Sequence, residues 1–357
     1  MERGLELRNR KKIITCILLF FMMLSSTITV SAEEAEGWHI DEQYHSLYDA
    51  LAYAETHKDE IGFSRMDFGE LCIGKPIQTY SYVDDGFEEL REMYPLIYQG
   101  ELVLWAINVD GKYQITTGLT TEINEVVDVN SEFALIYDMN NCYLYMNGEF
   151  VLLCNFNEEV STRAVLNPNE ISNIELRMGA LSEMTELNYD STKMARDVIY
   201  FSCNVGYISQ NPYKNLCWAA TIASITNYCK GTSLSMADIA ADKFGYVKDD
   251  SIDTAEANNI LGRYDVEYRY NNKPPTQSVI LSNIKANYPI YGCFVQSGTR
   301  SGHAVVIYGI NVIGDYLSLM DPANGFTSAT HNGSQYIFVS ANTGVTYELY
   351  NANCYSW

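Results

Sequence analysis

The sequence predicts an α+β protein whose second half folds as helices followed by an antiparallel sheet. From Leu216 to Tyr228 there is no Gly or Pro, and apolar residues recur at helical spacing. After Pro289 the pattern changes to short apolar runs that are typical of strands. Helices that come first in the chain, with antiparallel strands after them, are typical of the α+β class.

The first 32 residues have the composition of a secretory signal. Five basic residues precede a mostly apolar run from Ile13 to Val30, and Val30-Ser31-Ala32 is a small-residue cleavage signature. Several polar residues interrupt the second half of the run, so we favour cleavage over retention as a membrane anchor. We therefore expect residues 1–32 to be a signal peptide and the mature protein to be secreted (extracellular), with no membrane association after signal removal.

The net charge of −22 is concentrated in one part of the chain. Residues 200–357 contain nine basic and eleven acidic side chains, and the first 32 residues carry +3, which leaves −23 for residues 33–199. This asymmetry indicates two domains, which we expect at residues 33–190 (an acidic domain with its linker) and residues 191–357. The acidic half argues against nucleic acid and anionic membranes as partners.

The acidic segment has the pattern of a helix followed by a meandering antiparallel sheet. Apolar residues at helical spacing predict the helix at Asp41–His57. Asp110-Gly111 and Asn147-Gly148 each separate two strand-like runs by two residues, which is a strong hairpin signal. Residues 155–200 are rich in turn residues, so we expect the linker there. The strands are expected at Ile77–Val83, Glu101–Val109, Lys112–Thr117, Phe133–Asp138, Cys142–Met146 and Glu149–Leu153.

The second half of the chain contains four helical patterns and then five strand patterns. Gly262 is expected to end the third helix. The helices are expected at Leu216–Tyr228, Ser235–Ala240, Asp253–Leu261 and Thr276–Asn287. The strands are expected at Ile290–Val295, His303–Ile310, Tyr316–Met320, Tyr336–Ser340 and Val345–Tyr350.

Cys217 is a candidate nucleophile because it lies at the start of an apolar helix. We expect Asn215 to be the N-cap, which places Cys217 in the first turn. There the helix dipole and the unpaired N–H groups favour a thiolate and can receive a developing oxyanion. The alternative is a buried cysteine that packs as a small hydrophobe. The polar, turn-forming approach to this helix favours a reachable sulfur.

A nucleophilic cysteine needs a base and a third group that orients the base. Of the two histidines in the second domain, His331 is expected in an exposed turn. If residues 303–310 and 316–320 pair as a hairpin, His303 and Asp321 meet at the same edge of the sheet. Asp321 would then accept a hydrogen bond from Nδ1 of His303 and fix its tautomer. An ordinary core histidine beside an Asp-Pro turn is the alternative.

Gln210 lies seven positions before Cys217 and is a candidate second donor of an oxyanion hole, beside the backbone N–H of Cys217. The alternative is an ordinary turn residue. The chain has nine cysteines but no C-x-x-C pair, and its histidines do not cluster with cysteines, so we expect no metal and no cofactor. One or two disulfides are compatible with an exported protein, but the spacing does not pair them.

Three motifs occur in a characteristic order, namely Gln210-x6-Cys217-Trp218-Ala219-Ala220, Gly302-His303-Ala304-Val305-Val306 and Asp321-Pro322-x-Asn324-Gly325. As a set they resemble the papain-like cysteine peptidases of bacteria, in particular the staphopain-like and bacteriocin-leader-peptidase-like group. The resemblance covers about residues 200–357. It implies a papain-like fold, in which a central helix packs on an antiparallel sheet.

The resemblance also implies roles for individual residues. Cys217 would be the nucleophile, His303 the general base and acid, Asp321 the orienting residue, and Gln210 part of the oxyanion hole. Staphopains have Asn in place of Asp321, and Ala-Gly follows their cysteine where this chain has Trp218. The family carries an N-terminal propeptide, which the acidic residues 33–190 would form.

These observations predict a secreted cysteine endopeptidase made as a zymogen. Its partners would be a protein or peptide substrate and its own propeptide, with Lys193 and Arg196 as candidate processing sites in the linker. Two alternatives remain open. One is a Cys-His amidase or transferase that acts on cell-wall peptide, and the other is a non-enzymatic secreted binding protein that uses the tyrosine-rich sheet.

Overall fold

The computed structural model describes residues 45–56, 58, 63–83, 86–138, 141–155, 176–182, 184–187, 200–299, 301–312 and 315–357. The expected signal peptide and most of the expected linker, including Lys193 and Arg196, lie outside these residues. Residues Gln43–Trp357 form one compact unit. None of the helices in the described ranges is long and apolar enough to cross a membrane.

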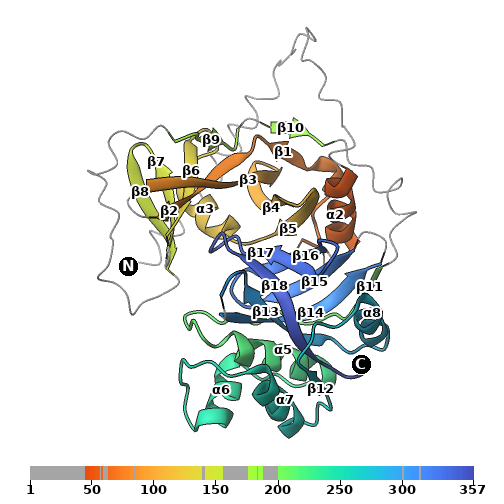
Figure 1. The fold of residues 1–357 in the computed structure, drawn as a ribbon. Helices are drawn as coiled ribbons and strands as arrows, with labels where there is room; N and C mark the ends of the chain where they lie inside the picture. Colours follow the sequence, from red (N-terminus) through yellow and green to blue (C-terminus); the bar gives the residue numbers. More distant parts are fainter. Residues whose placement is uncertain are drawn as a thin grey trace, which may run out of the picture. The chain divides into compact units, whose positions relative to one another are not determined.

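The N-terminal half of this unit combines short helices with a curved sheet (Figure 1). Strands β2 to β5 follow one another as antiparallel neighbours, and β6 to β8 continue as a second antiparallel set. The elements are α2 (His45–Thr56), the 3-10 helix η2 (Phe68–Glu70), β1 (Cys72–Gly74), β2 (Ile77–Val83), β3 (Gly86–Tyr98), β4 (Glu101–Val109), β5 (Lys112–Thr116), α3 (Thr120–Val126), β6 (Glu132–Tyr137), β7 (Asn141–Met146), β8 (Glu149–Asn155), β9 (Gly179–Ala180) and β10 (Met184–Glu186).

Both hairpin turns predicted for this half are present. Asp110 and Gly111 have φ of 53° and 84°, and Asn147 and Gly148 have φ of 55° and 82°. Positive φ at both central residues is the requirement of a two-residue hairpin turn, which explains why Asn-Gly and Asp-Gly are good signals. The expected helix is also present, as α2 among the described residues.

The sheet of the N-terminal half is not purely antiparallel, which corrects the expectation. Strand β2 pairs in parallel with β6, with Tyr80 opposite Ile136. A parallel neighbour needs a long crossover connection, and the chain supplies it as β3 to β5 and α3. Sequence reasoning missed β3 because its charged first half and Pro95 obscure the strand pattern.

The C-terminal half places its helices α5 to α8 before most of its sheet in the chain, as the sequence predicts (Figure 1). Strands β13 to β18 pair with antiparallel neighbours. The elements are β11 (Tyr200–Ser202), α5 (Cys217–Lys230), α6 (Met236–Phe244), α7 (Thr254–Arg263), β12 (Arg269–Asn271), α8 (Gln277–Lys285), β13 (Ile290–Gln296), β14 (Gly302–Asn311), β15 (Tyr316–Asp321), β16 (Gly325–His331), β17 (Tyr336–Val339) and β18 (Thr346–Cys354).

Several details of this half differ from the prediction. Helix α7 continues through Gly262 to Arg263, because a single glycine in a helix costs only about 1 kcal/mol relative to alanine. His331 is the last residue of β16 and not part of an exposed turn. The strand β16 itself was missed because its sequence, Gly325 to His331, has few large apolar residues.

The two halves are joined by hydrogen bonds and by apolar packing, and we call this contact the seam. Thr116 of β5 pairs with Thr327 of β16. The side chain of the fully buried Gln114 donates to the carbonyl of Val339 at 2.6 Å and accepts from its N–H at 2.6 Å. Buried apolar residues of both halves, such as Tyr113 and Trp218, belong to one core cluster. The seam therefore brings the N-terminal half up to the strands that follow Asp321.

Candidate active site

Cys217 is the first residue of α5. The N-cap position belongs to Leu216 and not to Asn215, which corrects the prediction. The backbone N–H of Asn215 donates instead to the Asp249 carboxylate at 2.8 Å, and that of Lys214 donates to the same group at 3.2 Å. Leu216 has no side-chain acceptor that could cap the helix. The first-turn N–H groups of α5, which lie beside Cys217, are therefore not capped by the N-cap side chain.

Helix α5 is held by its apolar face. Trp218, Ile222 and Ile225 are at most 2 % exposed. The indole N–H of Trp218 donates to the carbonyl of Asp250 at 2.9 Å, so the buried ring is also held in one orientation. The helix ends at Gly231, which adopts a φ of 64° as the C-cap. Cys217 therefore lies at the tip of a rigid element, and its side chain is only partly buried.

His303 and Asp321 meet as the hairpin argument predicts. Strands β14 and β15 are antiparallel neighbours, His303 is the second residue of β14, and Asp321 is the last residue of β15. Nε2 of His303 lies 2.7 Å from Oδ1 of Asp321. The imidazole side chain is 12 % exposed and the carboxylate is fully buried.

The ring nitrogen that faces Asp321 is Nε2, whereas the sequence argument expected Nδ1. The Cys217 side chain also hydrogen-bonds to the ring. A histidine at the start of a strand can present either edge of its ring, and sequence does not choose between them. The three side chains form a chain of contacts from the sulfur through the ring to the carboxylate.

The electrostatics of the pair favour its charged form. Burial lowers the pKa of His303, but the Asp321 carboxylate, its hydrogen bond and the Cys217 contact outweigh burial and raise that pKa well above its ordinary value. Burial raises the pKa of Asp321, but His303 and the donors of Ala323 and Asn324 bring it below its ordinary value. An imidazolium held beside a sulfur in this way is the partner that a nucleophilic thiolate requires.

The Asp321 carboxylate is fixed by further donors in the turn that follows it. Oδ1 accepts from the backbone N–H of Ala323 at 2.8 Å, and Oδ2 accepts from the side-chain amide of Asn324 at 2.6 Å. Sequence reasoning assigned no role to Asn324. The Asp321-Pro322-x-Asn324-Gly325 pattern was a usable signal, because Asp and Asn in Pro-Gly turns commonly bond to nearby backbone groups.

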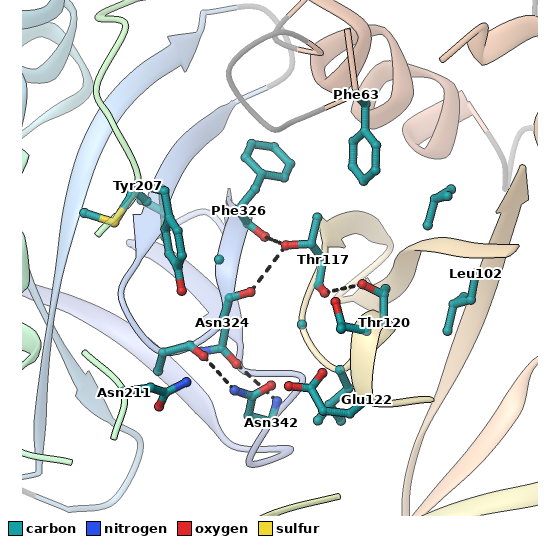
Figure 2. Close-up of a pocket in the computed structure, with 18 of the residues that line it drawn as sticks. Phe63, Leu102, Thr117, Thr120, Glu122, Tyr207, Asn211, Asn324, Phe326 and Asn342 are labelled. Atoms are coloured by element: carbon teal, nitrogen blue, oxygen red, sulfur yellow. Dashed lines mark hydrogen bonds between the residues drawn. The ribbon is translucent and has the colours of Figure 1, made fainter. Parts of the chain in front are cut away.

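Asn324 is itself held by residues of the segment that follows β17. Its Oδ1 accepts from the Ser340 hydroxyl at 3.0 Å and from the Asn342 N–H at 3.2 Å. Figure 2 shows the carbonyl of Asn324 facing Thr117, whose hydroxyl lies 3.4 Å from it. The turn after Asp321 is therefore braced from within the C-terminal half and touched by the N-terminal half.

A cavity of about 600 Å³ lies beside this turn (Figure 2). Tyr207 and Phe326 line it from the C-terminal half, and Leu102, Thr117 and Glu122 line it from the N-terminal half. The phenol of Tyr207 donates to the carbonyl of the residue after Asp321, Pro322, at 3.4 Å. The cavity thus adjoins the turn that follows Asp321.

Gln210 lies where the Cys217 loop meets the Asp321 turn, and it is 7 % exposed. Its backbone N–H donates to the carbonyl of Pro322 at 3.0 Å. Its side-chain Nε2 donates to the carbonyls of Tyr213 and Lys214 at 3.2 and 2.9 Å. The side chain therefore closes the loop that leads to Cys217, and its donor nitrogen has carbonyl acceptors in this conformation.

In the part of the chain that the structure describes, no group of three or more His, Cys, Asp or Glu side chains could hold a metal ion. The residues gathered at the tip of α5 suit nucleophilic acyl transfer. A sulfur contacts an imidazole there, and the imidazole contacts a buried carboxylate.

Comparison with known proteins supports this reading of the geometry. No curated protein matches the chain. Residues 200–339 match the model of a protein family described as papain-like cysteine protease AvrRpt2. The matched range contains Gln210, Cys217, His303 and Asp321, and it includes none of residues 33–190. The match supports a similarity of residues 200–339 to papain-like cysteine peptidases, and it indicates a hydrolase.

Proposed function

We propose that the protein is a secreted cysteine endopeptidase made as a zymogen, with Cys217, His303 and Asp321 as its catalytic residues. The observation that carries the proposal is the hydrogen bond of 2.7 Å between His303 and Asp321, together with the contact between the ring and Cys217. The family match of residues 200–339 supports the peptidase class.

The reaction follows from the charges at the site. The Cys217 thiolate attacks the carbonyl carbon of a peptide bond, and the resulting oxyanion accepts from the backbone N–H of Cys217. The C–N bond then breaks as the His303 imidazolium gives its proton to the departing amine. Neutral His303 next takes a proton from water, whose oxygen attacks the thioester, and the products are a carboxylic acid and the regenerated ion pair.

Gln210 would supply the second donor to the oxyanion. In the structure its Nε2 binds the carbonyls of Tyr213 and Lys214, so the role requires the side chain to turn toward the sulfur when substrate binds. Its buried Oε1 has no hydrogen-bond partner among the described residues, so only the nitrogen end of the amide is held against that rotation.

The N-terminal half would act as the propeptide. The contact between the halves supports this proposal. Gln114 hydrogen-bonds to Val339, and Thr117 hydrogen-bonds to the turn after Asp321. The proposed activation is cleavage in the linker, and secretion is proposed from the signal-like composition of residues 1–32.

The decisive experiment compares wild type with Cys217→Ala on casein, with labelling by an epoxide inhibitor of papain-type enzymes as the second readout. We expect the variant to lose both hydrolysis and labelling. Hydrolysis retained in Cys217→Ala would reject the proposal. Digestion of purified cell walls in parallel identifies the amidase alternative if walls are cut and casein is not. The N-terminal sequence and mass of both secreted proteins report whether the linker is cut and whether Cys217 cuts it.

A further inference from the structure

Two cysteines of the N-terminal half lie directly opposite each other in neighbouring strands. Cys142 is in β7 and Cys154 is in β8, and the antiparallel register pairs them across the ladder. The register shifts immediately after this pair, where Leu153 is the extra residue of a bulge. Among the strand pairings of the described residues, no other places cysteine opposite cysteine.

Directly opposed residues suit a disulfide by their spacing. In antiparallel strands, opposed Cα atoms are about 4.5 to 5.5 Å apart, and disulfides span Cα separations of about 4.4 to 6.8 Å. The side chains also lie on the same face. Cys142 is fully buried in the cluster that contains Tyr137 and Leu144, and the half-buried Cys154 packs against that same cluster.

The two thiols are already in contact in the reduced protein. The Cys142 side chain hydrogen-bonds to that of Cys154, and burial raises the pKa of Cys142 well above its ordinary value. A buried thiol with a raised pKa does not react first with an outside oxidant. The half-buried Cys154 is then the thiol that an oxidant reaches, with Cys142 poised beside it to complete the bond.

We propose that Cys142 and Cys154 form an intramolecular disulfide when the protein meets a small-molecule disulfide oxidant such as oxidised glutathione. The Cys154 thiolate attacks one sulfur of the oxidant, which forms a mixed disulfide and releases one reduced thiol. The Cys142 thiolate then attacks the Cys154 sulfur, which forms the protein disulfide and releases the second reduced thiol. Two protein thiols lose two protons and two electrons, and the oxidant is reduced to two thiols.

The position of this pair connects it with the seam. The Cys154 thiol donates to the carbonyl of Asn342 at 3.8 Å, and the nearby Tyr137 hydroxyl donates to the carbonyl of Ala341 at 2.7 Å. Asn342 in turn donates its side-chain amide to the carbonyl of Ala323. A covalent link between β7 and β8 therefore stabilises the hairpin that contacts the turn after β17, where the C-terminal half holds Asn324.

The other cysteines have different surroundings. Cys229 hydrogen-bonds to the hydroxyl of Tyr268, and Cys203 and Cys354 lie near that same hydroxyl. Cys72 lies opposite Glu186 and Ile97 in the two ladders of β1. Cys72 is half-buried like Cys154, so it is a matched control for a cysteine with no cysteine across the ladder.

The test is thiol mapping of the full-length protein at a series of glutathione redox ratios. Free thiols are blocked with iodoacetamide before digestion without reductant, and the linked peptides are identified by mass spectrometry. We expect a peptide pair joined through Cys142 and Cys154 in oxidising buffer, with Cys72 alkylated throughout. Alkylation of both Cys142 and Cys154 at every ratio, or linkage of either to another cysteine, would overturn the proposal.

Thermal unfolding gives a second measurement that does not depend on peptidase activity. The oxidised wild type is expected to melt several degrees above the reduced protein, because a cross-link lowers the conformational entropy of the unfolded chain. In Cys154→Ser the difference between oxidised and reduced samples should vanish, while in Cys72→Ser it should persist. An oxidised-minus-reduced difference of the same size in Cys154→Ser would contradict the assignment.

Discussion

The side-chain amide of Asn324 donates to Oδ2 of Asp321 at 2.6 Å, while the ring of His303 holds the other oxygen. The carboxylate is thus fixed at both oxygens. A buried carboxylate with two such donors keeps one orientation, and that orientation decides where the His303 ring points. The relationship makes Asn324 a positioning residue of the proposed site.

Replacement of Asn324 by Ala should lower kcat/KM about tenfold, because a hydrogen bond to a charged group is removed and the carboxylate can rotate. The backbone N–H of Ala323 still holds Oδ1, so activity should fall and not disappear. Steady-state kinetics on a quenched peptide measure the effect. Asn259→Ala, at an exposed position of α7, is the control and should retain wild-type values. Equal kinetics for both variants would remove Asn324 from the positioning of the site.

Replacement of Asp321 by Asn should move the alkaline limb of the pH profile of kcat/KM to lower pH. The carboxylate raises the pKa of His303, so its removal lets the imidazolium lose its proton at a lower pH. Because activity needs the protonated ring beside the thiolate, the alkaline limit follows that pKa downward. The profile is measured from below neutral pH to the alkaline range with the same substrate. An alkaline limb at the wild-type pH would mean that Asp321 does not set the protonation of His303.

Gln210→Ala separates the two roles of this side chain. If Gln210 supplies an oxyanion donor, kcat should fall about a hundredfold with little change in KM, since the donor acts in the transition state. If the side chain only closes the loop through Tyr213 and Lys214, the melting temperature should fall and kcat should change far less. Kinetics and thermal unfolding of the same preparation distinguish these outcomes, and an unchanged kcat excludes the oxyanion role.

Gln114→Ala tests the seam. The variant leaves the buried N–H and carbonyl of Val339 without their side-chain partner. Each unsatisfied group should lower the free energy of unfolding by about 1 to 3 kcal/mol. We expect the melting temperature to fall by several degrees while unfolding remains a single transition, because both halves share one core cluster. Gln335→Ala, outside the seam, is the comparison. Two separate transitions in the wild type would show that the halves do not unfold together.

The sequence predicted most individual elements because their signals are local. Asp110-Gly111 and Asn147-Gly148 define hairpins on their own, since the positive φ values of their turns need those residue types. The start of α5 was placed within one residue by its apolar period. The parallel pairing of β2 with β6 could not be predicted, because it depends on a crossover between residues far apart in the chain.

For the site, the sequence by itself predicted which residues could supply a nucleophile, a base and a carboxylate, and it determined the hairpin edge at which His303 and Asp321 meet. Only the tertiary structure decided that Nε2 of the ring faces the carboxylate, that Asn324 holds its other oxygen, and that Gln210 binds the Cys217 loop. The physical reason is that a residue type specifies a donor or an acceptor, whereas the partner it finds depends on the folded geometry of the strands, turn and loop around it.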